Sequence, residues 1–144
     1  MARSVHTLSI PSSTRYLGRV RRFVETHTRD AELTEEAIEQ FKIAVDEACT
    51  NVIKHAYRGD DTQRIDLAII IEDDRVTVLI RDAGRSFQQE FYRSPDIFEL
   101  AESRRAGGFG VHIMRSLMDQ VEYTSTGDTN EVRLTKFRNG RDSA

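Results

Sequence analysis

Three separated segments of the chain carry side chains that could do chemistry. Glu47 and Asn51 are four residues apart, so on a helix they would share one face, one turn apart. Asp82 follows a strongly apolar strand pattern, and Gly84 comes two residues later. The third segment is rich in glycine and precedes a helical pattern; its glycines are Gly107, Gly108 and Gly110. A carboxylate, an amide, an aspartate at a strand end and a glycine-rich helix start are together the parts of a site for a nucleotide and magnesium.

The Glu47 and Asn51 pair suits phosphoryl transfer. Mg²⁺ prefers oxygen ligands in octahedral geometry and shares them with phosphates and water, and the amide oxygen of Asn51 would supply one ligand without adding charge. Glu47 could orient or deprotonate a nucleophile near a γ-phosphate. The pair alone is also compatible with two solvated side chains on an exposed helix face, and that alternative stays open at this point.

Asp82 ends a strand, where a buried carboxylate is costly unless a hydrogen-bond donor faces it. The exocyclic amino group of adenine is such a donor, whereas guanine presents a carbonyl at the same position. Gly84 would let a flat base approach the backbone, because no Cβ intrudes. An ordinary Asp-Ala-Gly turn at the start of a loop is the alternative.

The glycine-rich segment predicts a phosphate contact, because backbone N–H groups at a helix N-terminus bind phosphate. It is not a Walker A loop, which needs Gly-Lys-Ser/Thr after four spacer residues. It is not a Rossmann fingerprint either, since no strand leads directly into it. Arg105 lies just before Gly107 and could approach a phosphate. A simple hinge and a solvated arginine are the alternatives.

Hydrophobic periodicity predicts the elements that would position these residues. Strands are expected over 5–10, 64–72, 75–81, 121–125 and 132–137. Helices are expected after Pro11-Ser12-Ser13, from a Thr34 cap to about Tyr57, and after Gly110. The polar stretch 83–106 is expected to hold a short helix after Ser94-Pro95. This order predicts an α+β fold, a two-layer sandwich of three helices on a mostly antiparallel sheet.

Composition narrows the class of protein. The chain has 144 residues, of which 38% are hydrophobic and 31% charged, which suits one compact globular domain over residues 1–144. A net charge of -3 argues against direct nucleic-acid binding. The longest apolar run, 67–71, is too short for a membrane span, and residues 1–4 lack a signal-peptide core, so we expect a cytoplasmic protein without a membrane partner. The single cysteine, Cys49, is predicted to be a small core residue.

Taken together, the three segments resemble the ATP-binding domain shared by gyrase, the Hsp90 chaperones, histidine kinases and the mismatch-repair protein MutL. Within that superfamily the chain is most similar to the bacterial anti-sigma factor serine/threonine kinases, over about residues 10–137. Residues 46–57 resemble the N box of that family, 82–87 its first glycine box, and 107–114 its second, including the continuation to Asp119.

The resemblance implies a Bergerat-type ATP-binding fold that uses ATP and Mg²⁺. It implies Asn51 on magnesium, Glu47 as catalytic base and Asp82 on the adenine amino group. The residues expected to contact the nucleotide are Asn51, Asp82, Gly84, Arg105, Gly107, Gly108 and Gly110.

The resemblance also implies a reaction and its partners. A phosphoryl group would move from ATP to a Ser or Thr of an anti-anti-sigma partner with a STAS-type fold. The same protein would sequester a sigma factor when that partner is phosphorylated, and such proteins commonly form homodimers. Two positions depart from the family pattern. Ser86 stands where the first glycine box often has Gly or Pro, and Asn130, one step after Thr129, falls where many relatives place a threonine near the adenine-binding aspartate.

Two other functions remain open from the sequence. One is a nucleotide-gated interaction module that binds ATP and a partner without phosphotransfer. The other is the catalytic domain of a split histidine kinase, although no helix pair with a phosphoacceptor histidine is predicted before the ATP-site segments. Glu47 favours the serine/threonine kinase, since binding alone would not require a base.

Overall fold

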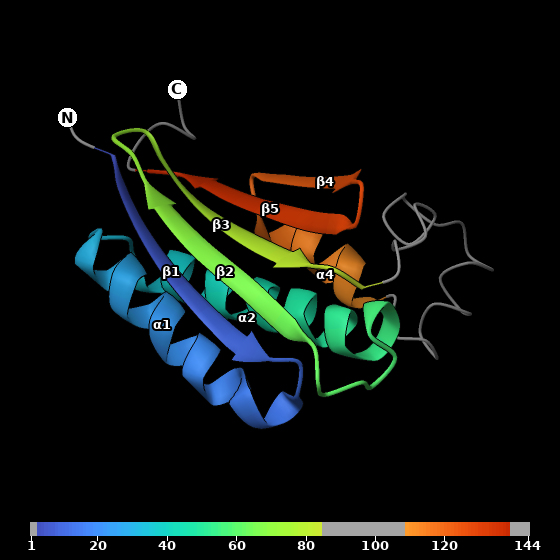
Figure 1. Cartoon of the computed structure of the whole chain (residues 1–144). Helices are drawn as coiled ribbons and strands as arrows, with labels where there is room; N and C mark the ends of the chain where they lie inside the picture. Colours follow the sequence, from blue (N-terminus) through green and yellow to red (C-terminus); the bar gives the residue numbers. More distant parts are fainter. Residues whose placement is uncertain (1–2, 85–108, 139–144) are drawn as a thin grey trace.

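The computed structural model describes residues 3–84 and 109–138, which form one five-stranded sheet with three helices on one of its faces (Figure 1). The strands are β1 (Ser4–Pro11), β2 (Arg64–Ile71), β3 (Arg75–Asp82), β4 (Gln120–Thr126) and β5 (Thr129–Phe137). The helices are α1 (Leu17–Asp30), α2 (Glu35–Asn51) and α4 (Phe109–Leu117), with a short 3₁₀ turn η1 (Thr14–Tyr16) and a π-helical turn η2 (Val52–Ala56). The predicted two-layer α+β fold is confirmed.

The strand order is β1-β2-β3-β5-β4, and every neighbouring pair is antiparallel. Short turns at Asp73-Asp74 and Gly127-Asp128 connect β2 to β3 and β4 to β5. Gly127 has a φ of 61°, which glycine adopts without a steric penalty. The last strand begins at Thr129, three residues earlier than predicted, so it reaches the end of β3 and places Asn130 opposite Asp82.

The core lies between the helices and the inner face of the sheet. Alternate residues of the two central strands point into it, as expected for strands with one buried face: Ile65, Leu67 and Ile69 from β2, and Val76, Val78 and Ile80 from β3. Cys49 is fully buried in the same cluster, and burial raises the pKa of its thiol to about 12. The prediction that Cys49 is a core residue is confirmed.

Helix α2 begins and ends near the predicted residues. The Oγ1 of Thr34 accepts a hydrogen bond from the backbone N–H of Ala37 at 3.1 Å, which caps the helix, and two glutamates occupy the first turn, where the helix dipole favours them. The helical chain continues through the π turn and stops at Tyr57. Arg58 and Gly59 then adopt φ values of 52° and 81°, which reverse the chain.

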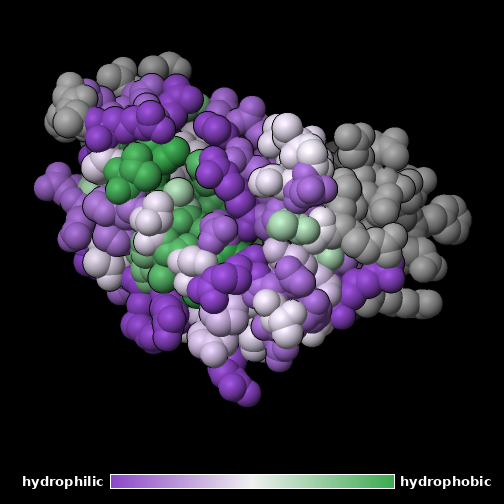
Figure 2. All heavy atoms as spheres, in the orientation of Figure 1, coloured by the Kyte–Doolittle hydropathy of each residue, from purple (hydrophilic) through white to green (hydrophobic). Residues whose placement is uncertain are grey.

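The outer face of the sheet carries an apolar patch that the described helices leave uncovered. Val5 lies opposite Ile70, and Ala68 lies opposite Leu79, so these side chains share that face. Val5 is 51% exposed. Figure 2 shows a hydrophobic area on the near side of the molecule with hydrophilic residues around it. Among the described residues, no helix has both the length and the apolar character to cross a bilayer.

Candidate functional site

A small cavity lies where the end of α2, helix α4 and the paired strands β3, β5 and β4 meet. Its volume is about 20 Å³, which is room for about one water molecule and less than a purine needs. Its lining includes Ala48, Asn51, Val52, Asp82, Met114, Tyr123, Ser125 and Asn130. The structure therefore brings together Asn51 and Asp82, which are separated by about thirty residues in the sequence and were both predicted to be site residues.

Asn51 is the last residue of α2, at the point where the helix changes to the π turn. It is 5% exposed, and its Nδ2 is buried without a hydrogen-bond partner in the part of the chain that the structure describes. Leaving a buried amide donor unsatisfied costs about 1–3 kcal/mol. π turns inside helices occur frequently at functional sites. An amide held in this way fits a residue whose partner is a ligand.

Glu47 lies one turn before Asn51 on α2 and is half-buried, but it is not one of the cavity-lining residues. Burial raises the pKa of its carboxyl, and the nearby charge of Asp46 raises the pKa further, whereas Lys54 lowers it. A carboxylate with a raised pKa is a stronger base, so this environment suits the proton-accepting role that the sequence indicated.

Asp82 is the last residue of β3 and is 8% exposed. Its Oδ1 accepts two hydrogen bonds, from Asn130 Nδ2 at 2.9 Å and from the backbone N–H of Gly84 at 2.9 Å. Burial raises the pKa of Asp82, and these two hydrogen bonds lower it. From the sequence, the amino group of adenine was expected to be the hydrogen-bond donor that this buried carboxylate needs. The structure shows that the protein itself supplies two donors, both at Oδ1.

The structure gives a packing reason for glycine at position 84. A Cβ at this position would lie 2.6 Å from the backbone oxygen of Ala56 and 2.8 Å from Tyr57 Cδ1. The missing side chain therefore lets the end of β3 pack against the end of the π turn. The expected role of Gly84 beside a flat base stays a prediction.

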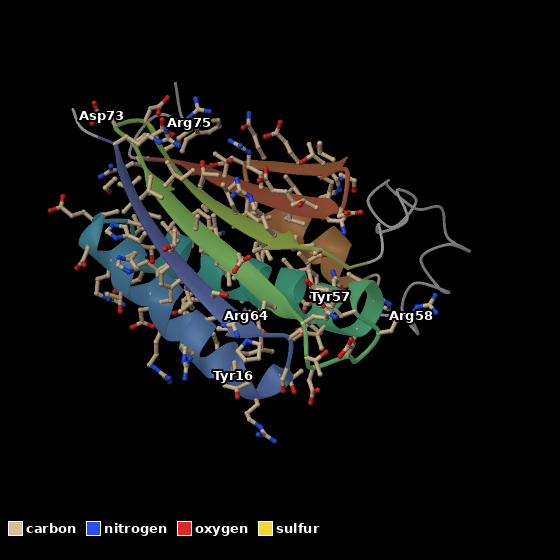
Figure 3. The ribbon with its side chains drawn as sticks, in the orientation of Figure 1. Tyr16, Tyr57, Arg58, Arg64, Asp73 and Arg75 are labelled. Atoms are coloured by element: carbon tan, nitrogen blue, oxygen red, sulfur yellow. The ribbon has the colours of Figure 1, made fainter. Side chains whose placement is uncertain are left out.

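Tyr57 was predicted only as a helix end, and the structure gives it a further role. Its hydroxyl donates to the backbone oxygen of Arg64 at 2.6 Å and accepts from the backbone N–H of Ala83 at 2.8 Å. Tyr57 and Arg64 lie close together in Figure 3, at the end of the helical segment and the start of β2. A buried tyrosine usually has a partner for its hydroxyl, and that rule is the one signal that the sequence offered.

The remaining predicted residues divide into two groups. Gly110 lies in the first turn of α4, and Met114 of that helix lines the cavity. Arg105, Gly107 and Gly108 lie outside the described residues, as do Ser86 and the short helix expected after Pro95.

The described residues could hold magnesium only if phosphate and water supplied most of its ligands. Residues 3–84 and 109–138 contain no group of three or more His, Cys, Asp or Glu that could hold a metal ion. An Mg²⁺ ion takes one or two protein oxygens and completes its shell with phosphates and water. The side chain of Asn51, placed in the cavity, is suited to that kind of site.

The α+β sandwich of three helices on an antiparallel sheet is the fold that the sequence predicted for an ATP-binding domain. The profile of the histidine kinase-like ATPase domain matches residues 10–136, so the chain belongs to this family. Two relatives named serine-protein kinase RsbW show its place within the family. The one from Listeria monocytogenes serotype 4a is 36% identical over 138 residues, covering 92% of this chain and 87% of the relative. The one from Bacillus pumilus is 34% identical over 142 residues, covering 92% and 85%. The chain is thus a member of the RsbW serine-protein kinases, as its sequence motifs predicted.

Solved structures agree on the fold. The crystal structure of the RsbU and RsbW domains of Rv1364c from Mycobacterium tuberculosis matches 94% of this chain and 32% of its own with a TM-score of 0.67 at 14% identity. The histidine kinase domain of a blue-light activated kinase from Erythrobacter litoralis matches 93% of this chain and 64% of its own with a TM-score of 0.57 at 16% identity. At these identities the matches support the fold alone.

Proposed function

We propose that this protein is an ATP-dependent serine/threonine kinase that phosphorylates an anti-anti-sigma partner of the STAS type and sequesters a sigma factor when that partner is phosphorylated. The observation that carries the proposal is the convergence of Asn51 and Asp82 on one cavity, in a chain whose relatives are serine-protein kinases. We place the reaction in the cytoplasm, where ATP and sigma factors are found.

Adenine would bind at Asp82, and the triphosphate would extend toward Asn51 and the start of α4. The carboxylate of Asp82 would accept a hydrogen bond from the adenine amino group, and the amide oxygen of Asn51 would be a magnesium ligand. Backbone N–H groups near Gly110 lie at a helix N-terminus, where phosphate binds well. Because the cavity is smaller than a purine, its walls have to separate when the base enters.

Glu47 is the group that we assign to proton transfer. It would accept the hydroxyl proton of the partner's Ser or Thr while the hydroxyl oxygen bonds to the γ-phosphorus and the bond to ADP breaks. Magnesium, when bound, neutralises charge that develops on the phosphate oxygens. The half-buried position of Glu47 raises the pKa of its carboxyl, which makes the carboxylate a stronger base.

A transfer assay tests the proposal. The protein, labelled ATP and Mg²⁺ are incubated with a STAS-domain protein encoded beside it. We expect label on a Ser or Thr of that protein, with Glu47→Ala binding ATP normally and transferring slowly. ATP binding without any transfer, the same for wild type and Glu47→Ala, would instead favour an interaction module that uses ATP as a conformational ligand.

We also propose that the protein forms a homodimer through the outer face of its sheet. On that face Val5 is exposed and Ala68 is half-buried, and they lie opposite the buried apolar side chains of Ile70 and Leu79. A charge within such a contact would be buried without a partner. Val5→Asp should therefore convert dimer to monomer in sedimentation equilibrium, and a wild type that is already monomeric at micromolar concentration would contradict this part.

A further inference from the structure

Asn130 connects three elements at the edge of the cavity. It lies opposite Asp82 in the pairing of β3 with β5, and opposite Ser125 in the pairing of β4 with β5. Its Nδ2 donates to Asp82 Oδ1 at 2.9 Å and to the backbone oxygen of Gly84 at 3.1 Å. Its Oδ1 accepts from Ser125 Oγ at 2.7 Å.

These contacts fix the orientation of the Asn130 amide. The two hydrogens of Nδ2 have two acceptors, Asp82 and Gly84, and the oxygen faces a hydroxyl donor. If the amide were flipped, its oxygen would face a carboxylate oxygen and a carbonyl oxygen, and both contacts would be repulsive. Asp82 and Gly84 select this orientation, and the hydrogen bond from Ser125 adds a third contact that holds the Asn130 amide in it.

We propose that Asn130, oriented by Ser125, determines which nucleobase the site accepts, by fixing the carboxylate of Asp82 so that its Oδ2 faces the base. This inference rests on the proposed binding of a nucleotide at Asp82. Both hydrogen bonds that the described residues donate to the carboxylate use Oδ1, which leaves Oδ2 as the acceptor for an exocyclic amino group.

Selectivity by this route depends on a carboxylate that is ionised and held in place. Adenine presents an amino group, which donates to a carboxylate, whereas hypoxanthine and guanine present a carbonyl, which a carboxylate repels. Burial alone raises the pKa of Asp82, and the hydrogen bonds from Asn130 and Gly84 oppose that effect. Without Asn130 the carboxylate would lose one of its two anchors and could turn away from the base, so the gain for adenine and the penalty for a carbonyl would both shrink.

An asparagine suits this task better than a hydroxyl residue. One amide nitrogen serves Asp82 and the carbonyl of Gly84 at once, so it ties the carboxylate to the backbone two residues later. A threonine has a single hydroxyl hydrogen, which could serve Asp82 but not Gly84 at the same time. Asn130 is thus a positioning residue that acts on the base through Asp82.

The test compares ATP with inosine triphosphate, whose base carries a carbonyl in place of the amino group. Dissociation constants for both nucleotides with Mg²⁺ are measured by isothermal titration calorimetry for wild type, Asn130→Ala, Asn130→Thr and Ser125→Ala. The ratio of the two constants is the readout, because a general loss of folded protein weakens both nucleotides equally. Thr126→Ala is the matched control, because Thr126 is exposed, lies in the same hairpin and does not line the cavity.

We expect the preference for ATP to fall about tenfold in Asn130→Ala, which is the size of one lost charge-assisted hydrogen bond. Asn130→Thr should recover part of the preference, because its hydroxyl can still donate to Asp82. Ser125→Ala should reduce the preference a few-fold, and Thr126→Ala should match the wild type. If Asn130→Ala is too unstable to measure, a reduced preference in Asn130→Thr and Ser125→Ala supports the proposal on its own.

Two results would overturn the inference, and they differ in what else they affect. A wild type that prefers ATP, with variants that keep the same preference while binding both nucleotides more weakly, would show that Asn130 only supports the fold. A wild type that binds neither nucleotide would remove the proposed function, and this inference with it.

Discussion

The two ends of helix α2 are built by different rules. At its start, Thr34 caps the first turn and the charged side chains are paired on the surface; Arg29 bonds to Glu35, and Lys42 Nζ lies 2.7 Å from Glu25 Oε1. At its end, the α-helix changes to a π turn, and the Nδ2 of the buried Asn51 has no hydrogen-bond partner within the described residues.

The difference separates what stabilises the fold from what prepares a site. The start of the helix follows local rules, each of which lowers the free energy of the folded state by a small amount. The end of the helix departs from those rules in two ways, by its irregular backbone and by its unsatisfied donor, and both departures face the same cavity. Proteins generally accept such departures where function requires them. The comparison predicts that changes at the end of α2 affect activity and those at its start affect stability.

Asn51→Ala should have the largest effect. It should abolish Mg²⁺-dependent ATP binding, because the proposed magnesium ligand is removed. The free energy of unfolding should hold or rise by up to about 1 kcal/mol, since a buried unpaired amide disappears and alanine favours the helix. Calorimetric titration with ATP and urea unfolding measure the two quantities. If the variant bound ATP normally but unfolded more easily, Asn51 would stabilise the fold and would not bind the nucleotide, and the two ends of α2 would not differ in the way described.

Glu47→Ala should slow phosphotransfer by about a hundredfold or more, the usual effect of a lost general base, and should leave the dissociation constant of ATP nearly unchanged. Single-turnover transfer to the partner protein measures the rate. A hundredfold loss of ATP affinity instead would show that Glu47 belongs to the binding site.

The pH dependence of the phosphotransfer rate is a second test of Glu47 as the proton acceptor. Glu47 accepts a proton only when ionised, so the rate should rise with pH through a pKa that burial places above the usual glutamate value. The charge of Asp46 is the second cause of that increase, so Asp46→Asn should move the inflection to lower pH. The ion pair that Asp46 makes with Arg21 is exposed, so its loss should cost little stability. An inflection that stays in place would mean that another group titrates.

Tyr57→Phe should have an intermediate effect, which lowers both the free energy of unfolding and the affinity for ATP. The variant loses the two hydrogen bonds that join the end of the helical segment to the backbone of Arg64 and Ala83. With the Ala83 N–H left unpaired, we expect a loss of about 1–3 kcal/mol in the free energy of unfolding. ATP should bind a few-fold more weakly, because Asp82 lies next to Ala83 and would be less firmly held once the hydrogen bond from the Ala83 N–H is lost. Tyr16→Phe is the control, because Tyr16 lies in the 3₁₀ turn η1 and does not line the cavity. If Tyr57→Phe and Tyr16→Phe changed the free energy of unfolding and the ATP affinity equally, the two hydrogen bonds of the Tyr57 hydroxyl would not matter for either property.

Much of the fold could be predicted because periodicity and caps act locally. Three expectations depend on residues close together in sequence and are confirmed: the cap at Thr34, the end of that helical segment near Tyr57, and the two strands expected over 64–72 and 75–81. The start of β5 was missed, because Asn130 has little strand propensity and is held in the strand by pairing with β3 and β4.

The site was harder to predict than the fold because its contacts join distant segments. The sequence motifs indicated Asn51 and Asp82, and the family resemblance placed Asn130 near that aspartate. Neither indicated that Asn130 would hydrogen-bond to Asp82, or that Gly84 would pack on Ala56. Such contacts depend on sheet register and on the shape of the π turn, neither of which is encoded by spacing along the chain. The roles of Arg105, Gly107 and Gly108 stay predictions.

Thr34→Ala should have the smallest effect on activity. The change removes the hydrogen bond to Ala37 N and should lower the free energy of unfolding by about 1 kcal/mol. ATP affinity and the transfer rate should match the wild type, because the cap lies more than four helical turns from Asn51 and its loss frays only the first turn. Thr34→Ser, which keeps the cap, should restore the stability. If Thr34→Ala weakened ATP binding while Thr34→Ser did not, the start of α2 would be coupled to the site through the helix. Stability at one end of α2 and ATP binding at the other would then not be independent.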